Sequence, residues 1–254
     1  MKYFFLIPFI LVFLIFDGGQ CYAQLLNVES MRIRTDTTGW FGEVGLSGSY
    51  IESESTVLQA DARGLIEYKG KKSLILLLGN YNLLTGDGKS LVDNYMLHLR
   101  YNYKITKWLR WEVFGQYQQN EILSIHQRIL LGTGPRYKLA DNKKVRLYLG
   151  TLVMWEFEQE SNPEKTKHDD YRFSNYLSFN ITPASNLEIV STTYYQPQTN
   201  YFPDFRILNQ NSLLVKAGKH FVFSVNYQLA YDSRPAIGIL NRTSQLSSGL
   251  AYKF

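Results

Sequence analysis

Segments of about ten residues in which apolar and polar side chains alternate recur along most of this chain. A period of two places successive side chains on opposite faces of a β-strand. The clearest runs are 95–103 and 221–231, in which Leu, Tyr, Phe or Val occupies every second position. Because nearly every segment carries one large apolar face, the fold must cover these faces with a very large core or place them in lipid.

Twelve such segments can be delimited, and their length of about ten residues suits strands that cross a membrane at a tilt. The predicted strands are residues 40–50, 56–68, 73–82, 94–103, 109–118, 125–138, 145–158, 171–181, 187–196, 205–217, 221–231 and 246–254. Most connections are short, and the longer ones are predicted at 82–91, 159–169, 197–204 and 233–241. Short turns on one side and longer loops on the other are typical of outer-membrane barrels.

The last strand ends the chain on an aromatic residue. Leu250, Tyr252 and Phe254 share one face and occupy the fifth-from-last, third-from-last and last positions. This pattern resembles the assembly signal of bacterial outer-membrane barrels. The alternative is an ordinary edge strand, but an apolar terminal residue would then be left in water, where chain ends usually fray.

The first residues are typical of a secretory signal peptide. Lys2 precedes an apolar run at 3–16, and a polar stretch leads to Ala23, after which we predict cleavage. The apolar run is shorter than the ~20 residues of a membrane span. Cys21 is the only cysteine, and a lipoprotein interpretation is disfavoured because Gln20 replaces the small residue expected before it. Residues 24–38 show no period and are predicted to be a periplasmic lead-in.

Composition agrees with a barrel and excludes other classes. The net charge is +5, but the basic residues form no cluster, so no nucleic-acid partner is expected. Aromatic residues make up 15% of the chain, with 19 Tyr, which suits the interfacial girdles of a barrel. The competing architecture is a secreted β-sandwich, whose core would be oversized for two sheets. We therefore predict a single antiparallel transmembrane β-barrel of about twelve strands over residues 39–254, with both termini periplasmic.

If the apolar faces meet lipid, the alternate faces fill the barrel lumen. The predicted lumen residues are Asp61, Arg63, His98, Arg100, Arg110, Glu112, Arg128, Arg136, Arg146, Glu156 and Arg172. Two interpretations stay open, namely a self-satisfied polar network that plugs the barrel and a narrow pore whose selectivity follows from the arginines.

One hairpin allows a register to be predicted. Pairing residues whose numbers sum to 212 sets Arg100 opposite Glu112 and Asn102 opposite Arg110, and places the centre of the turn at Thr106. We predict an ion pair between Arg100 and Glu112 inside the barrel.

The sequence offers little for catalysis. Ser124 and His126 lie two residues apart, as a hydrolase nucleophile and its base could, but no carboxylate follows to orient the histidine. His168 beside two aspartates is interpreted as solvated loop charge. We therefore predict a non-enzymatic protein with no metal and no cofactor. The alternative is an outer-membrane hydrolase of lipid or lipopolysaccharide.

Two segments carry a family resemblance. Residues 110–120, RWEVFGQYQQN, and 128–137, RILLGTGPRY, resemble the DUF481 family of salt-induced outer-membrane proteins, and the sharpest part is Gly132 to Tyr137. A second barrel family, DUF2490, is the nearest competitor. The resemblance implies a Gram-negative outer-membrane barrel with a link to envelope stress, and it implies no reaction and no ligand.

The expected function follows from these points. We predict an outer-membrane β-barrel that is a structural or stress-related envelope protein or a narrow, porin-like channel of unassigned substrate. Its expected partners are outer-membrane lipids and lipopolysaccharide, the barrel assembly machinery acting through the last strand, and a small solute or an ion.

Overall fold

The computed structural model describes residues 28, 32, 37–52, 56–87, 89–142 and 144–253. The predicted signal peptide at 1–23, most of the lead-in at 24–38, and Phe254 of the predicted assembly signal lie outside the described residues. Those predictions therefore stay predictions.

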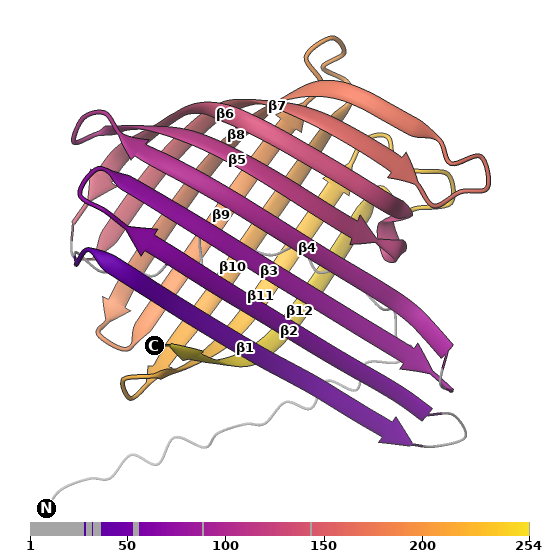
Figure 1. Ribbon diagram of the computed structural model, residues 1–254, viewed down its shortest axis with the longest axis horizontal. Coiled ribbons are helices and arrows are strands. Elements are labelled where there is room, and N and C mark those ends of the chain that lie inside the picture. The colour runs from indigo at the N-terminus through magenta and orange to yellow at the C-terminus, as the bar shows by residue number, and fades with distance from the viewer. Residues whose placement is uncertain are drawn as a thin grey trace, which may run out of the picture.

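Twelve antiparallel strands form a closed barrel in which each strand pairs with its neighbours in sequence and β1 pairs with β12 (Figure 1). This confirms the predicted fold. Within the described residues, no helix has the length and hydropathy of a membrane span. The strands are β1 (Gly39–Glu52), β2 (Thr56–Lys69), β3 (Ser73–Gly86), β4 (Lys89–Lys104), β5 (Leu109–Asn120), β6 (Ile125–Asp141), β7 (Val145–Glu160), β8 (Lys167–Ala184), β9 (Leu187–Pro197), β10 (Phe205–Ala217), β11 (Phe221–Asp232) and β12 (Arg242–Lys253), with the turn η1 (Glu121–Leu123) between β5 and β6.

The wall of the barrel is apolar outside and polar inside. On β4, Leu97, Leu99 and Tyr101 are exposed on the outer surface, whereas His98 and Arg100 between them are buried. The same alternation continues around the barrel, so the apolar faces predicted from the sequence form one continuous outer band. This arrangement reverses that of a water-soluble domain and is the one that a lipid environment requires.

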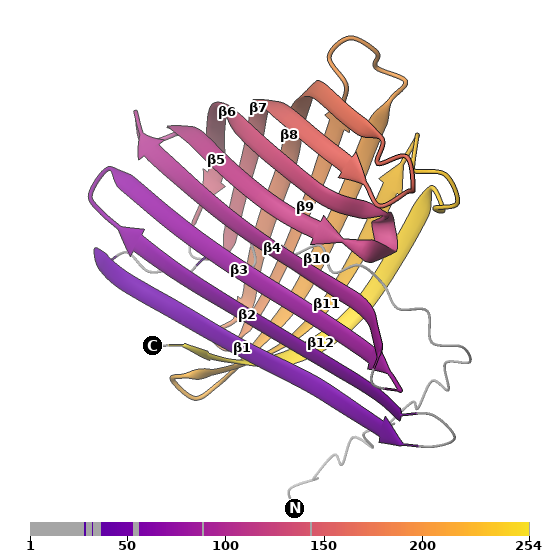
Figure 2. The same cartoon turned by 45° about the vertical axis from the view of Figure 1, so that its right-hand side comes forward.

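The two ends of the barrel differ. The end at which β1 begins and β12 ends, here called the terminal end, has connections no longer than the four residues between β4 and β5. The opposite end, called the loop end, carries the longer connections 161–166, 198–204 and 233–241 (Figure 2). The predicted contrast between short turns and longer loops is present.

The predicted loop at 82–91 is wrong. Strand β3 continues to Gly86 and β4 begins at Lys89, so a two-residue connection replaces the loop. Asp87 has a φ of +50°. An Asp-Gly dipeptide favours the positive φ angles of a tight hairpin, and this local signal outweighs the polar composition of the segment.

The predicted loop at 159–169 is mostly wrong for another reason. Strand β7 continues to Glu160 and β8 begins at Lys167. Polar side chains stabilise this extension, because Trp155 Nε1 donates to Asp169 Oδ1 at 2.6 Å and His168 Nε2 lies 2.8 Å from Glu160 Oε1. The additional residues of β7 and β8 are thus largely polar, and hydrophobic alternation gives no signal for a strand there.

The predicted β4–β5 register is also wrong. Each residue of β4 faces the residue of β5 that lies two positions further along the chain than predicted. Asn102 faces Glu112, and Arg100 faces Phe114. The reason lies in the turn, where the Thr106 hydroxyl accepts hydrogen bonds from Leu109 N at 3.0 Å and Trp108 N at 3.3 Å and shifts the centre of the hairpin to residue 107. The parity of the prediction is correct, so the same side chains face the lumen.

Two glycines on the inner surface leave room for aromatic rings of the neighbouring strand. A Cβ atom at Gly132 would collide with the ring of Phe114, its partner across β5 and β6, and a Cβ at Gly150 would collide with the ring of Tyr176 across β7 and β8. Both rings therefore lie flat against the wall at positions where only glycine leaves room, and they fill the lumen.

Strand β3 is apolar on both faces in sequence, and its inner face has a partner. Leu74, Leu76 and Leu78 point inward and form a buried cluster with Leu65, Met96 and Val28. Val28 and Arg32 belong to the predicted lead-in, and both are buried. At these two positions the chain before β1 contacts the inside of the barrel.

Candidate functional site

The barrel interior is the candidate site, and the structure brings all the sequence-predicted lumen residues into it or to its mouths. The buried members and their strands are His98 and Arg100 on β4, Glu112 on β5, Arg128 and Arg136 on β6, Glu156 on β7, and Arg172 on β8. The half-buried members are Asp61 and Arg63 on β2, Arg110 on β5, and Arg146 on β7.

A central network surrounds Glu112, which is 0% exposed. Arg136 Nη1 lies 3.3 Å from Glu112 Oε1, and Arg100 Nη1 lies 3.9 Å from the same oxygen. The predicted Arg100–Glu112 ion pair is therefore present, although it runs diagonally between strands. Tyr176 on β8 reaches across the lumen to donate to Glu112 Oε2. The Arg136 guanidinium also lies 4.0 Å from the ring centroid of Tyr148, so one buried cation is held by a carboxylate and an aromatic face.

His98 extends this network. Arg100 Nε donates to His98 Nε2 at 3.2 Å, and His98 Nδ1 lies 2.9 Å from Gln116 Oε1. Because the arginine can only donate, Nε2 must accept, and the proton of the neutral ring is assigned to Nδ1. His98 is thus fully used in hydrogen bonds between side chains.

A second network lies nearer the loop end. Glu156 is paired with Arg128 at 3.1 Å, with Arg172 at 2.7 Å, and with Arg206. Arg206 lies on β10, across the lumen from β7, and also contacts Glu158 at 3.2 Å. The network is completed by Arg172 with Asp204 and by Arg206 with Asp232. Three arginines and four carboxylates therefore bridge the interior from wall to wall.

Sequence reasoning missed four members of this second network, namely Glu158, Arg206, Asp204 and Asp232. Glu158 shares the parity of Glu156 on β7, and Arg206 shares the parity of the buried Gln210 on β10. Consistent alternation would have identified both. Arg32 had no such signal, because the residues before β1 carry no period.

An apolar belt lies among the charged side chains. Phe114, Leu152, Met154, Tyr176 and Tyr194 are buried together inside the barrel, and Leu130 and Leu208 pack against them. These side chains come from β5, β7, β8 and β9, with additions from β6 and β10. The belt and the ion pairs are therefore both buried inside the barrel.

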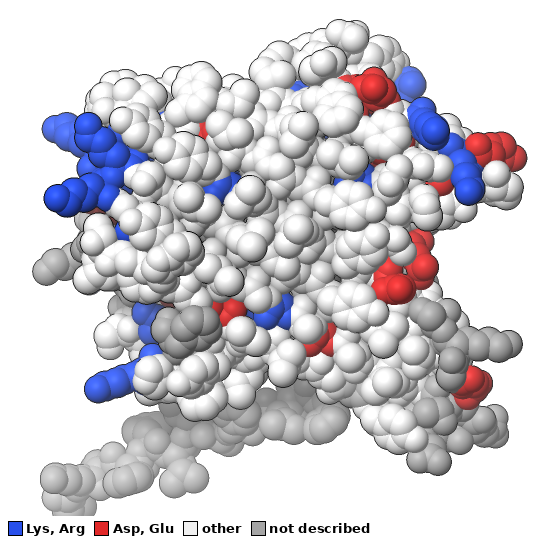
Figure 3. All heavy atoms as spheres, in the orientation of Figure 1, with Lys and Arg blue, Asp and Glu red and all other residues white. Residues whose placement is uncertain are grey.

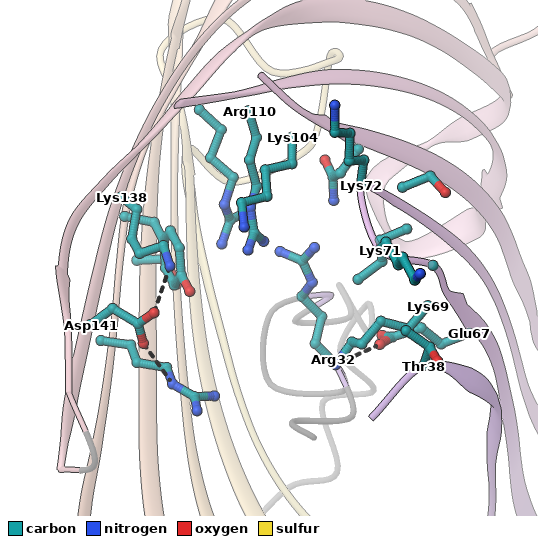
Figure 4. Close-up of a pocket in the computed structure, with 18 of the residues that line it drawn as sticks. Arg32, Thr38, Glu67, Lys69, Lys71, Lys72, Lys104, Arg110, Lys138 and Asp141 are labelled. Atoms are coloured by element: carbon teal, nitrogen blue, oxygen red, sulfur yellow. Dashed lines mark hydrogen bonds and ion pairs between the residues drawn. The ribbon is translucent and has the colours of Figure 1, made fainter. Parts of the chain in front are cut away.

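A basic cavity of about 490 Å³ opens at the terminal end and is called here the vestibule. Figure 4 shows Arg32, Lys104 and Arg110 converging on its middle. Lys and Arg side chains also gather on the outer surface at this end, at the left of Figure 3. The ionisable groups that line the vestibule are nine basic and two acidic side chains, Arg32, Lys69, Lys71, Lys72, Lys104, Arg110, Arg136, Lys138 and Arg146 against Glu67 and Asp141.

A further cavity of about 370 Å³ opens at the loop end. The charged residues of the second network form one wall, and apolar residues that include Ile207, Leu208 and Leu240 form the other. The two cavities have no lining residue in common. The vestibule and the loop-end cavity are therefore distinct cavities among the described residues.

The residues proposed for hydrolysis are not brought together. Ser124 caps the short helix η1 with a left-handed backbone, whereas His126 is exposed on β6. No hydrogen bond joins the two side chains in the described structure. Among those same residues, no group of three or more His, Cys, Asp or Glu side chains could hold a metal ion.

The comparisons with known proteins identify the family. The model of the family "Protein of unknown function, DUF481" matches residues 42–254. This chain belongs to the DUF481 family. The assignment confirms the resemblance inferred from the segments 110–120 and 128–137.

Two solved structures show a barrel similar to that of this DUF481 protein. The NanC porin is 10% identical, with a TM-score of 0.51, and the match covers 84% of this chain and 98% of the porin. The translocator domain of the autotransporter NalP from Neisseria meningitidis is 11% identical, with a TM-score of 0.50, and the match covers 86% and 90%. No curated protein matches this chain. The DUF481 chain thus has the fold of an outer-membrane β-barrel.

Proposed function

We propose that this DUF481 protein is an outer-membrane barrel that is closed to general solutes and binds a small anion in its vestibule. The single observation that carries the proposal is the charge of that cavity, in which nine basic side chains face two acidic ones. Clustered like charges repel one another and raise the affinity of a site for ions of opposite sign.

The placement of the basic groups supports anion binding over simple surface charge. Asp141 is already paired with Lys138 at 2.6 Å and with Arg146 at 3.2 Å, and Glu67 lies 3.6 Å from Lys69. The two acids therefore already have basic partners, and the other basic side chains that line the cavity outnumber them. Arg110 and Lys104 face its middle, and phosphate or carboxylate groups can accept several hydrogen bonds from such cations.

The interior supports closure over general diffusion. An open porin has a water-filled lumen, whereas here Glu112 and Arg136 are at most 1% exposed and the rings of Phe114 and Tyr176 are buried in the same interior. The similarity to a porin concerns the wall of the barrel and does not extend to its packed interior.

Anion binding is tested with mature protein in lipid nanodiscs and inorganic phosphate as the probe. We expect calorimetry to show binding that the double variant Arg110→Gln, Lys138→Gln weakens at least tenfold. Lys107→Gln is the matched control, because Lys107 is exposed at the same end but does not line the vestibule. If both variants weakened phosphate binding equally, the binding would be due to general surface charge, and the proposed anion site in the vestibule would be wrong.

Closure is tested separately by single-channel conductance in a planar bilayer. We expect folded protein, verified by its heat-modifiable gel mobility, to give no lasting conductance steps. Steady steps with anion preference would overturn closure and favour the pore interpretation of the lumen arginines.

A further inference from the structure

The pairing of β1 with β12, here called the seam, closes the barrel. It is much shorter than the pairing between any other two neighbouring strands. Strands β1 and β12 pair only over 43–46 with 250–253, whereas the next shortest pairing, between β8 and β9, has eight residue pairs. Beyond this stretch the edges 47–52 of β1 and 242–249 of β12 have no partner strand on that side among the described residues. Both views show the two strands diverging toward the loop end (Figures 1 and 2).

A cavity of about 310 Å³ lies at this divergence. Its walls are the two edges, Gly45–Gly48 and Gln245–Leu250. The apolar side chains on its outer margin are well exposed, with Leu46 at 69% and Leu246 at 64%, against 52% for Leu97 and 53% for Leu131 in fully paired parts of the wall. The wall of the barrel therefore has a lateral opening with apolar margins.

Polar groups line the inner side of the opening. Unpaired backbone is tolerated at membrane depth only where it lines an aqueous cavity or is covered by protein, and a polar interior satisfies the first condition. Arg63 lies behind the gap, with Nη2 3.5 Å from Ser224 Oγ on β11 and 3.9 Å from Glu43 on β1. Asp61 accepts from Ser47 Oγ at 3.4 Å in the same cavity. The charge of Arg63 is thus offset by Glu43, and Asp61 already accepts hydrogen bonds from Ser47, Gln59 and Asn82, so the cavity favours no strongly charged ligand.

The hydrogen-bonding groups left in the cavity indicate the kind of ligand. Gln245 Oε1 is buried and accepts no hydrogen bond from the described residues, so it calls for a donor. Arg63 can supply further N–H donors and calls for an acceptor. Hydroxyl groups provide both functions without charge. A neutral polyol headgroup therefore fits the inner side, and an acyl chain fits the apolar margins.

We propose that the gap between β1 and β12 is a lateral binding site for a membrane amphiphile with an uncharged, hydroxyl-rich headgroup. The headgroup contacts Arg63 and Gln245, and the acyl chain lies between the two strands in the bilayer. This site is separate from the vestibule and does not depend on anion binding there.

The sequence also permits the seam to close. Extending the observed register, in which residue numbers sum to 296, would pair Tyr50 with Leu246 on the lipid face and Ser47 with Gly249 on the inner face. These pairs match in size and polarity, as in the rest of the wall. Closing the seam would remove the site, which provides the means to test it.

The experiment uses mature protein in lipid nanodiscs and a monoacylglycerol with a photoreactive diazirine on its headgroup. In the double variant Tyr50→Cys, Leu246→Cys, oxidation joins the two strands by a disulfide. The matched control is Leu77→Cys, Leu99→Cys, which joins residues already paired on β3 and β4. Cys21, the only natural cysteine, precedes the predicted mature start and cannot interfere.

We expect mass spectrometry to find the label on lumen-facing residues of β1, β2 and β12. Oxidation of the seam variant should reduce this labelling at least tenfold, and reduction of the disulfide should restore it, whereas the control variant should label normally in both states. Gln245→Leu, which removes the acceptor but leaves the seam open, should also lower the labelling.

Three results would overturn the proposal. If the labelling were spread over the outer surface and unchanged in the oxidised seam variant, the probe would be acting as bulk lipid and not as a ligand of the site. Failure of the seam disulfide to form, combined with normal labelling of Gln245→Leu, would exclude the headgroup contact. Loss of labelling upon addition of a strand-forming peptide, but not of unlabelled monoacylglycerol, would assign the edges to a partner strand.

Discussion

At the scale of single residues, the interior depends on buried charges that have partners. Glu112 is the shared acceptor of Arg100, Arg136 and Tyr176, which come from three different strands. Burying an ion costs several kcal/mol, which only close partners offset, so removal of one partner leaves the others uncompensated.

We therefore predict that Glu112→Gln destabilises the barrel by about 3–5 kcal/mol, because the buried Arg136 charge loses its counter-ion while the side-chain volume is kept. Urea unfolding in lipid vesicles, followed by tryptophan fluorescence, measures the loss. Asp141→Asn is the control, because the Lys138–Asp141 pair is partly exposed and its loss should cost about 0–1 kcal/mol. Equal effects of the two variants would contradict the central role of Glu112.

At the scale of elements, alternation predicted the twelve strands and which side chains face inward. It failed where strand formation depends on other signals. The hairpin at Asp87 follows from backbone preference, and the extension of β7 and β8 follows from polar contacts such as Trp155 with Asp169. The contact between Val28 and the inner face of β3 could not be predicted, because it joins a segment without any period to a strand that is apolar on both faces.

The lumen residues could be assigned by parity, but their partners could not. Glu156 and Arg206 lie on β7 and β10, and a contact across the lumen depends on the curvature of the whole wall, which no single hairpin reveals. The vestibule was missed for a related reason. Its lysines lie at the ends of β2, β4 and β6, and they are scattered in sequence although they meet in space.

The β4–β5 turn gives a prediction at this scale. Thr106→Ala should destabilise the hairpin by roughly 0.5–1.5 kcal/mol per lost hydrogen bond to Leu109 N and Trp108 N. Thr106→Ser keeps the hydroxyl and should behave like the native protein. The midpoint of urea unfolding distinguishes the three proteins. An unchanged midpoint for Thr106→Ala would show that the Thr106 hydroxyl does not determine the register.

At the scale of the whole molecule, the even number of strands places the start of β1 and the end of β12 at the terminal end. We predict that this end faces the periplasm and that the loop end faces the exterior, as in other barrels with short turns on one side. The vestibule would then take up its anion from the periplasmic side.

The orientation is testable in intact cells with a membrane-impermeant maleimide. Glu164→Cys, exposed at the loop end, should react before lysis. Lys71→Cys, exposed at the terminal end, should react only after the outer membrane is permeabilised. Labelling in the reverse order would show that the barrel has the opposite orientation and would contradict the periplasmic placement of the vestibule.

The aromatic rings seated on Gly132 and Gly150 have an evolutionary consequence. On the proposed closure, they obstruct the lumen without changing the backbone, because each ring lies over a glycine within an otherwise regular wall. Permeability is then a property of a few exchangeable side chains rather than of strand number or barrel diameter. A lineage that keeps these twelve strands can pass between sealed and conducting proteins through substitutions at Phe114, Tyr176 and their neighbours, without rebuilding the scaffold that inserts into the membrane.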